Sequence, residues 1–198
     1  MRTRPFVLAS ASPARLRLLQ QAGLQPRVVV SGVDEETLGA GLGPSETAQV
    51  LARAKATAVA AGSGIPEGAL VLGCDSVFEF DGIGLGKPRD AAEALARGVA
   101  MSGREGTLWT GHALIDSASG EIAQELVGTV VRFAAFDQEE MRSYVATGEP
   151  LLVAGGFTLD GLGAPLVEGV VGDPGNVIGV SVPALRRLVR SLRMQWYC

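Results

Sequence analysis

Hydroxyl and basic side chains gather near the N-terminus, where an apolar run ends in a turn. Residues 8–15 read Leu-Ala-Ser-Ala-Ser-Pro-Ala-Arg, which predicts a helix beginning at Pro13 with Ser12 as its cap. The free N–H groups of such a terminus, the hydroxyl of Ser10 and the guanidinium of Arg15 suit phosphate oxygens. The alternative is that Ser12 is only a cap and Arg15 a solvated residue. The GxxxxGK[ST] pattern of a P-loop is absent.

A single carboxylate stands in the segment Leu-Gly-Cys-Asp-Ser, residues 72–76. We expect Asp75 at the end of a buried strand, where ligands bind in open α/β sheets. It could hold a divalent metal or activate water; the alternative is a turn or helix cap. Cys74 is a poor nucleophile candidate, because an apolar site and a neighbouring carboxylate raise the pKa of a thiol.

The chain has only two lysines, Lys55 and Lys87, among 17 basic residues. This bias makes both lysines candidates for a specific role, because an ammonium and a guanidinium are not interchangeable. Lys55 lies on the apolar face of the longest predicted helix, where its stem could instead cover apolar neighbours. Lys87 follows Gly86 and precedes Pro88 in a stiff turn, and the alternative is an exposed loop charge.

Three further features carry weaker signals. The acidic run Asp34-Glu35-Glu36 could complete a metal site or be solvated. The glycine-rich stretch 154–179, which contains Asp160, indicates backbone packed against a ligand or a close lobe, or else a string of tight hairpins. The lone His112 lies inside a β run and receives no role. A CxxC or Cys/His zinc pattern is absent.

Composition limits the class of protein. The chain has 198 residues, 47% of them apolar, and a net charge of −4. This excludes disorder and speaks against a general nucleic-acid binder, which needs a broad positive surface. Two cysteines cannot form a disulfide framework. The apolar stretch after the basic N-terminus is too short for a signal peptide, and no apolar run is long enough to span a membrane. We expect a cytoplasmic protein without nucleic-acid or membrane partners.

The elements that must position these residues alternate between strands and helices. Apolar runs predict strands at 5–9, 27–30, 69–73 and 77–80, and two long β runs at 108–115 and 121–135 predict an antiparallel hairpin. Helical spacing and caps predict helices at 13–22, 46–61, 90–101, 137–147 and 183–192, while 31–43 reads as a loop and 153–180 as short β segments. The mixture favours an α/β fold with a mixed, partly antiparallel sheet and flanking helices.

In their order, these segments resemble the Maf family of nucleoside triphosphate pyrophosphatases. The resemblance rests on LASASPARLRLL, VDEE, LARAKA, GCDSV, LGKPRDAAEA, MSGRE, the T-x-V-x-F run, GEPLLVAGGFTLDGLGAPLVE and GDPGNVIG. It implies one domain over residues 1–198, with two lobes around a cleft, related in shape to inosine triphosphate pyrophosphatases.

The resemblance also implies an activity. A nucleoside triphosphate is hydrolysed to a monophosphate and pyrophosphate with Mg²⁺ or Mn²⁺, by a cytoplasmic homodimer that clears non-standard nucleotides and is linked to septum formation and cell-division arrest. By motif match Asp75, Lys55 and Lys87 are catalytic, Ser10, Arg15, Glu35 and Asp160 bind substrate, and Asp75 with Glu35 holds the metal. Ala14 stands where many members have a second arginine, Asp160 where pyrimidine-directed members have glutamine, and Ser76 where threonine is usual.

The residues by themselves agree with this activity, because attack on a phosphate of a triphosphate demands neutralisation of charge and a positioned water. Two rival functions differ in what they predict. A nucleotidyltransferase would release pyrophosphate only with a second substrate. A non-catalytic, nucleotide-binding regulator of septum formation would bind without turnover.

Overall fold

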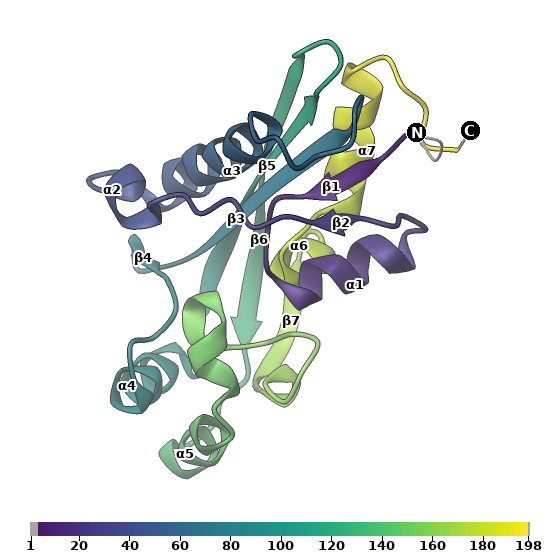
Figure 1. The fold of residues 1–198 in the computed structure, drawn as a ribbon. Helices are drawn as coiled ribbons and strands as arrows, with labels where there is room; N and C mark the ends of the chain where they lie inside the picture. Colours follow the sequence, from purple (N-terminus) through teal and green to yellow (C-terminus); the bar gives the residue numbers. More distant parts are fainter. Residues whose placement is uncertain (1–3, 198) are drawn as a thin grey trace.

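A mixed sheet of seven strands forms the centre of the protein in a computed structural model that describes residues 4–197 (Figure 1). The strand order is β2-β1-β3-β5-β6-β7, and β4 pairs with β3. Strand β1 runs parallel to β2 and β3, whereas the other pairs are antiparallel. The prediction of a mixed α/β sheet is therefore confirmed. The strands are β1 Phe6–Leu8, β2 Arg27–Val28, β3 Leu70–Phe80, β4 Ile83–Leu85, β5 Glu105–Asp116, β6 Ile122–Phe133 and β7 Val167–Val171.

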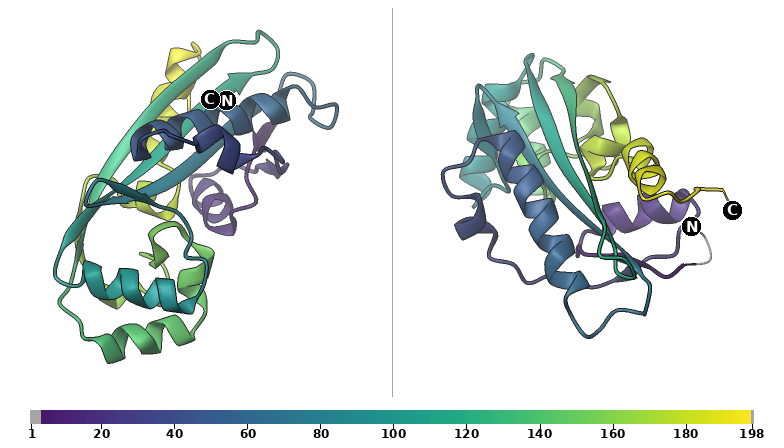
Figure 2. Two further views of the ribbon diagram at one scale, coloured as in Figure 1. Left: turned by 90° about the vertical axis from the view of Figure 1, so that its left-hand side faces the viewer. Right: turned by 90° about the horizontal axis from the view of Figure 1, so that it is seen from above.

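Helices cover both faces of this sheet (Figure 2). The long helix α3 packs on β3 and β5 from one side, while α1, α6 and α7 lie on the other. Helices α4 and α5 pack against each other at one end of the molecule (Figure 1). The helices are α1 Pro13–Gln21, α2 Glu35–Gly39, α3 Pro44–Ala60, α4 Ala91–Met101, α5 Gln138–Ala146, α6 Pro174–Ile178 and α7 Val182–Ser191. No helix among residues 4–197 is long and apolar enough to cross a membrane.

Side chains of β3 alternate between the two layers. Leu70, Leu72 and Cys74 belong to the core under α1 and α7, whereas Val71 belongs to the core under α3. Because a strand repeats every two residues, Asp75 points to the α3 side and the next residue points to the α1 side. A single strand thus supplies polar groups to both walls of the space above it.

Helix α3 lies unusually close to the sheet. A Cβ atom added to Gly73 would lie 2.2 Å from the carbonyl oxygen of Ala52, and one on Gly111 would lie 2.2 Å from that of Ala48. Only glycine therefore fits at these two strand positions. The close approach brings Lys55 down to the level of the strand, within reach of Asp75.

Strand β3 is longer than predicted. Residues 74–76 were expected to separate two strands and to leave Asp75 at a strand end, which is wrong: Cys74, Asp75 and Ser76 continue the strand because they pair with β5. The strand that ends here is β1, at Leu8. Residues 73–77 of β3 lie between the parts paired with β1 and with β4, and this stretch has no strand pairing on that side among the described residues.

Other local predictions have mixed outcomes. The pair Asp81-Gly82, which is typical of hairpin turns, joins β3 to β4 with both residues at positive φ, and the predicted helix at 137–147 begins with a capping box of Asp137 and Glu140. The acidic loop 31–43 contains the short helix α2, capped by Asp34. The stretch 153–180 holds one strand, β7; much of the rest forms short helical turns, including the 3₁₀ turns Ala154–Gly156 and Ala164–Leu166, and helix α6.

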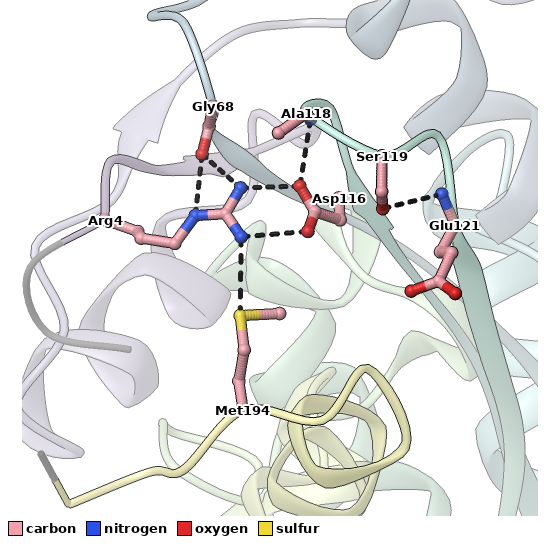
Figure 3. Close-up of polar contacts among 7 residues, drawn as sticks. All are labelled: Arg4, Gly68, Asp116, Ala118, Ser119, Glu121 and Met194. Atoms are coloured by element: carbon pink, nitrogen blue, oxygen red, sulfur yellow. Dashed lines mark hydrogen bonds and ion pairs between the residues drawn. The ribbon is translucent and has the colours of Figure 1, made fainter.

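A polar clamp ties the two ends of the described chain to the hairpin of β5 and β6 (Figure 3). Arg4 donates to the carbonyl oxygen of Gly68 and, through Nη1, to Oδ2 of Asp116 at 2.9 Å. The same Nη1 contacts the Sδ atom of Met194, beyond α7. Asp116 also accepts from the backbone N–H of Ala118, which closes the hairpin turn. The clamp joins the segment before β1 to the segment before β3 and to the end of β5.

Candidate active site

One cavity of about 1040 Å³ opens over the free edge of β3. Its walls come from the turn after β1, the first turn of α1, helices α2 and α3, the loop after β4 and the glycine-rich segment. Asp34 and Glu36 of the acidic run do not contribute to the lining, whereas all seven site residues that the family resemblance implies do: Ser10, Arg15, Glu35, Lys55, Asp75, Lys87 and Asp160.

Lys55 links two carboxylates on the α3 side of the cavity. Its Nζ atom lies 2.5 Å from Oδ1 of Asp75 and 2.8 Å from Oε1 of Glu35. Lys55 and Asp75 are buried, whereas the side chain of Glu35 is 55% exposed. The alternative that Lys55 only covers apolar neighbours with its stem is wrong, because its ammonium is buried and paired with these carboxylates instead of reaching solvent. Residues of the acidic run have different places: Asp34 caps α2, and Glu35 lines the cavity.

Burial raises the pKa of the Asp75 carboxyl above its usual 3.8, and the positive charges of Lys55 and Arg15 oppose this rise. A carboxylate in this setting is a better proton acceptor than a solvated one. Burial likewise raises the pKa of the Cys74 thiol to about 12, so this thiol stays protonated at neutral pH. The expectation that Cys74 is a poor nucleophile is confirmed by this environment.

Arg15 forms the opposite wall and is 9% exposed. Its Nε–H donates to the carbonyl oxygen of Gly179 at 2.8 Å, Nη1 to Oγ of Ser10 at 3.0 Å, and Nη2 to Oγ of Ser76 at 2.9 Å. All three partners are neutral, and no carboxylate of the described residues forms an ion pair with Arg15. A buried cation without a counter-ion is costly, so this arrangement favours an anion in the cavity.

Lys87 and Asp160 line the cavity without touching the groups above. Lys87 is exposed, and the loop that carries it is fixed because the carbonyl oxygen of Gly86 accepts from Arg97 and from the backbone N–H of Gly155. Asp160 forms an ion pair with Arg17 of α1 at 3.0 Å, which joins the glycine-rich segment to the helix across the cavity.

A carboxylate that the sequence did not indicate organises the glycine-rich segment. Glu149 accepts from the hydroxyls of Tyr144 and Thr158 and from the backbone N–H groups of Leu162 and Gly163. These bonds fix the loop that carries Asp160. The structure thus explains the glycines as a tightly folded wall of the cavity, and the proposed string of hairpins is wrong.

Comparison with known proteins decides the family. Residues 5–192 match the sequence model described as Maf-like protein. The chain belongs to the Maf family. It is similar to proteins named nucleoside triphosphate pyrophosphatase from Streptomyces avermitilis, with 58% identity, and Thermosynechococcus vestitus, with 50% identity. These matches cover 96% and 95% of this chain and 91% and 93% of the two relatives.

A divalent cation fits the donor set of this Maf protein. Asp75 and Glu35 each use one oxygen for Lys55, and their other oxygens, Oδ2 and Oε2, have no hydrogen bond within the described part of the chain. Mg²⁺ is commonly held by one or two carboxylates together with phosphate oxygens and waters. No cluster of three or more potential ligand side chains occurs among residues 4–197, so the substrate and water would complete such a site.

Sequence reasoning missed the groups behind Arg15. Gly179 after α6 accepts from Arg15 directly, whereas Thr110 on β5 bonds Ser76 and Asn176 of α6 bonds Thr110; all three lie far from Arg15 in the chain. Gly179 has φ of +127° and its Cβ would lie 3.0 Å from Nε of Arg15, so a side chain there would displace the guanidinium. The only available signal was the motif GDPGNVIG, whose asparagine and last glycine are these residues.

Proposed function

We propose that this Maf protein hydrolyses nucleoside triphosphates to a nucleoside monophosphate and pyrophosphate. The observation that carries the proposal is the pairing of two unlike walls in one cavity. On one side is the buried guanidinium of Arg15 without a counter-ion, and on the other the buried carboxylate of Asp75 with Lys55. The first suits a polyphosphate, and the second suits proton transfer from water beside it.

The chain's own residues divide the work as follows. Arg15 and Lys87 hold phosphate oxygens, together with the N–H groups at the first turn of α1 beside Ser10. Asp75 takes a proton from the water that attacks the α-phosphorus; the bond between the α-phosphorus and the bridging oxygen breaks, and pyrophosphate leaves. Lys55, now between two carboxylates, stabilises the charge that develops. We assign Asp160, which lines the cavity and pairs with Arg17, to the nucleoside end of the substrate.

Asp75 and Glu35 would hold a divalent cation, which supplies further neutralisation of phosphate charge when bound. We expect Mg²⁺ or Mn²⁺ to restore pyrophosphate release after treatment with a chelator. Lack of any metal effect would remove this part of the proposal and leave the roles of Arg15 and Asp75 intact.

The test is release of pyrophosphate from normal and modified nucleoside triphosphates supplied one at a time. Asp75→Asn keeps the shape of the side chain and removes its charge, and turnover should fall about 100-fold or more. Asp81→Asn, at an exposed ion pair outside the cavity, is the matched control and should keep full turnover.

Each rival function gives a different result in this assay. Pyrophosphate that appears only with a second substrate would identify a nucleotidyltransferase. Tight binding with no turnover, unchanged in Asp75→Asn, would identify a regulator. Near-normal turnover of Asp75→Asn would remove Asp75 from the chemistry.

A further inference from the structure

A chain of hydrogen bonds runs from Arg15 into the core beneath α6. Nη2 of Arg15 donates to Oγ of Ser76 at 2.9 Å, and Oγ of Ser76 lies 2.9 Å from Oγ1 of Thr110. The hydroxyl of Thr110 lies 3.0 Å from the carbonyl oxygen of Asn176 and donates to it. Thr110 is fully buried, so water does not replace its bond to Asn176 without a rearrangement of the core.

The donor and acceptor roles in this hydrogen-bond chain are fixed at both ends. A hydroxyl has one proton to donate, and Thr110 gives it to a carbonyl oxygen, which only accepts. Thr110 must therefore accept from Ser76, whose own proton is spent in that bond. A guanidinium donates and never accepts, so Ser76 offers Arg15 only its lone pairs. Each bond in the chain therefore has only one possible donor and one possible acceptor, and Ser76 has no proton left for a ligand in the cavity.

Asn176, at the inner end of the hydrogen-bond chain, is held rigidly. The side-chain amide of Asn176 is fully buried and donates to the carbonyl oxygens of Leu108 and Val127 on the two central antiparallel strands. This anchors the short helix α6 to the sheet and presents the backbone oxygen of Asn176 to Thr110. The same turn ends at Gly179, whose carbonyl oxygen holds Nε–H of Arg15.

The hydrogen-bond chain determines which N–H donors of Arg15 face the cavity. A guanidinium has five N–H donors, and the bonds to Gly179, Ser10 and Ser76 use three of them. Two remain, one on each terminal nitrogen. Without the bond to Ser76, Gly179 and Ser10 alone would hold the guanidinium, and its Nη2 end, one arm of the fork that phosphate oxygens need, would no longer be fixed.

We propose that Thr110 is a positioning residue of this enzyme, which acts through Ser76 to fix the guanidinium of Arg15 in the orientation that binds the triphosphate. The proposal rests on the proposed function. It concerns a residue that lines no part of the cavity and that no sequence motif singled out.

Two substitutions separate positioning from stability. Thr110→Val keeps the shape and removes the hydroxyl, so we expect KM for the triphosphate to rise about 3- to 10-fold with kcat within about twofold of wild type. Thr110→Ser removes a buried methyl group and keeps the hydroxyl, so it should lower the melting temperature and leave KM within about twofold of wild type. Thr107→Val, on the same strand with its side chain on the opposite face, is the control and should leave KM unchanged.

A double-mutant cycle tests the path through Ser76. In a Ser76→Ala background, Thr110→Val should change KM by less than about twofold, because the link is already broken. If Thr110→Val does not fold, Ser76→Ala alone should raise KM about 3- to 10-fold.

An unchanged KM in Thr110→Val or in Ser76→Ala, equal rises in KM for the valine and serine variants at position 110, or additive effects in the cycle would each overturn the positioning role. Failure of the wild-type protein to release pyrophosphate from any triphosphate would instead reject the proposed function.

Discussion

Protonation of His112 should limit the stability of this protein in mild acid. His112 is fully buried on β5, between Cys74 of β3 and Glu125 of β6 in the sheet register. Its Nε2 atom accepts from the backbone N–H of Ser181 at 2.9 Å. Burial, reinforced by the positive charge of Arg15, lowers the pKa of His112 from 6.5 to about 4.

The magnitude follows from linkage. Between pH 6.5 and pH 4 an unfolded chain binds a proton at His112 that the folded protein does not bind. The free energy of unfolding therefore falls as pH is lowered through this interval, at about 1.36 kcal/mol per pH unit. At pH 4 the loss amounts to about 3 kcal/mol, a large part of the about 5–15 kcal/mol that stabilises an ordinary domain. Above pH 6.5 the contribution vanishes, because both states are neutral.

The assay is urea denaturation of the wild-type protein and of His112→Gln at several pH values from 7 to 4. Glutamine does not titrate, and its side-chain oxygen is able to accept from Ser181. Other titrating groups contribute equally to both proteins, so the wild type should lose about 3 kcal/mol more than the variant over the interval. Parallel stability curves for the two proteins would refute the reasoning. So would a variant that is more sensitive to acid than the wild type.

Two further predictions concern packing and charge. Gly73→Ala should destabilise the protein by about 1–3 kcal/mol and lower turnover, because the new methyl group pushes α3 and Lys55 away from Asp75. Thermal melts and pyrophosphate release, compared with Gly169→Ala, where nothing lies within 4 Å, check this; equal behaviour of the two variants would contradict it. Arg4 lowers the pKa of Asp116 from 3.8 to about 2, so their pair stabilises the fold above pH 3.8 and this contribution is lost as pH falls toward 2. Asp116→Asn should cost about 2 kcal/mol at pH 7 and almost nothing near pH 2; urea titrations at the two values should show that difference, and an equal cost at both would count against the ion pair.

Local chemistry in the sequence was enough to predict where several helices begin and where the chain turns. The caps Ser12 and Asp137 mark helix starts, and each accepts the backbone N–H bonds that its residue type predicts. The Asp81-Gly82 turn needs two positive φ values, which these residue types tolerate. Such signals act over a few residues, and the fold needs only to respect them.

Where a strand ends was not a local matter. Residues 74–76 looked like a break because two polar residues follow a glycine and a cysteine. Pairing with β5 across more than 30 residues of sequence keeps them extended, so Asp75 lies within a strand and β1 is the strand that stops. The candidate site therefore opens at the end of a neighbouring strand, which no spacing within residues 72–76 could indicate.

The sequence by itself determined the ingredients: a hydroxyl and an arginine at a helix start, two lone lysines, one carboxylate after an apolar run, and the family they resemble. Only the tertiary structure decided their states. Arg15 is a buried cation because Gly179 and Ser76, 164 and 61 residues away in the chain, supply its acceptors. The charge of Lys55 is paired with Asp75 because α3 packs on a glycine of β3. Charge, burial and orientation depend on distant neighbours, and a sequence specifies such neighbours only through the fold.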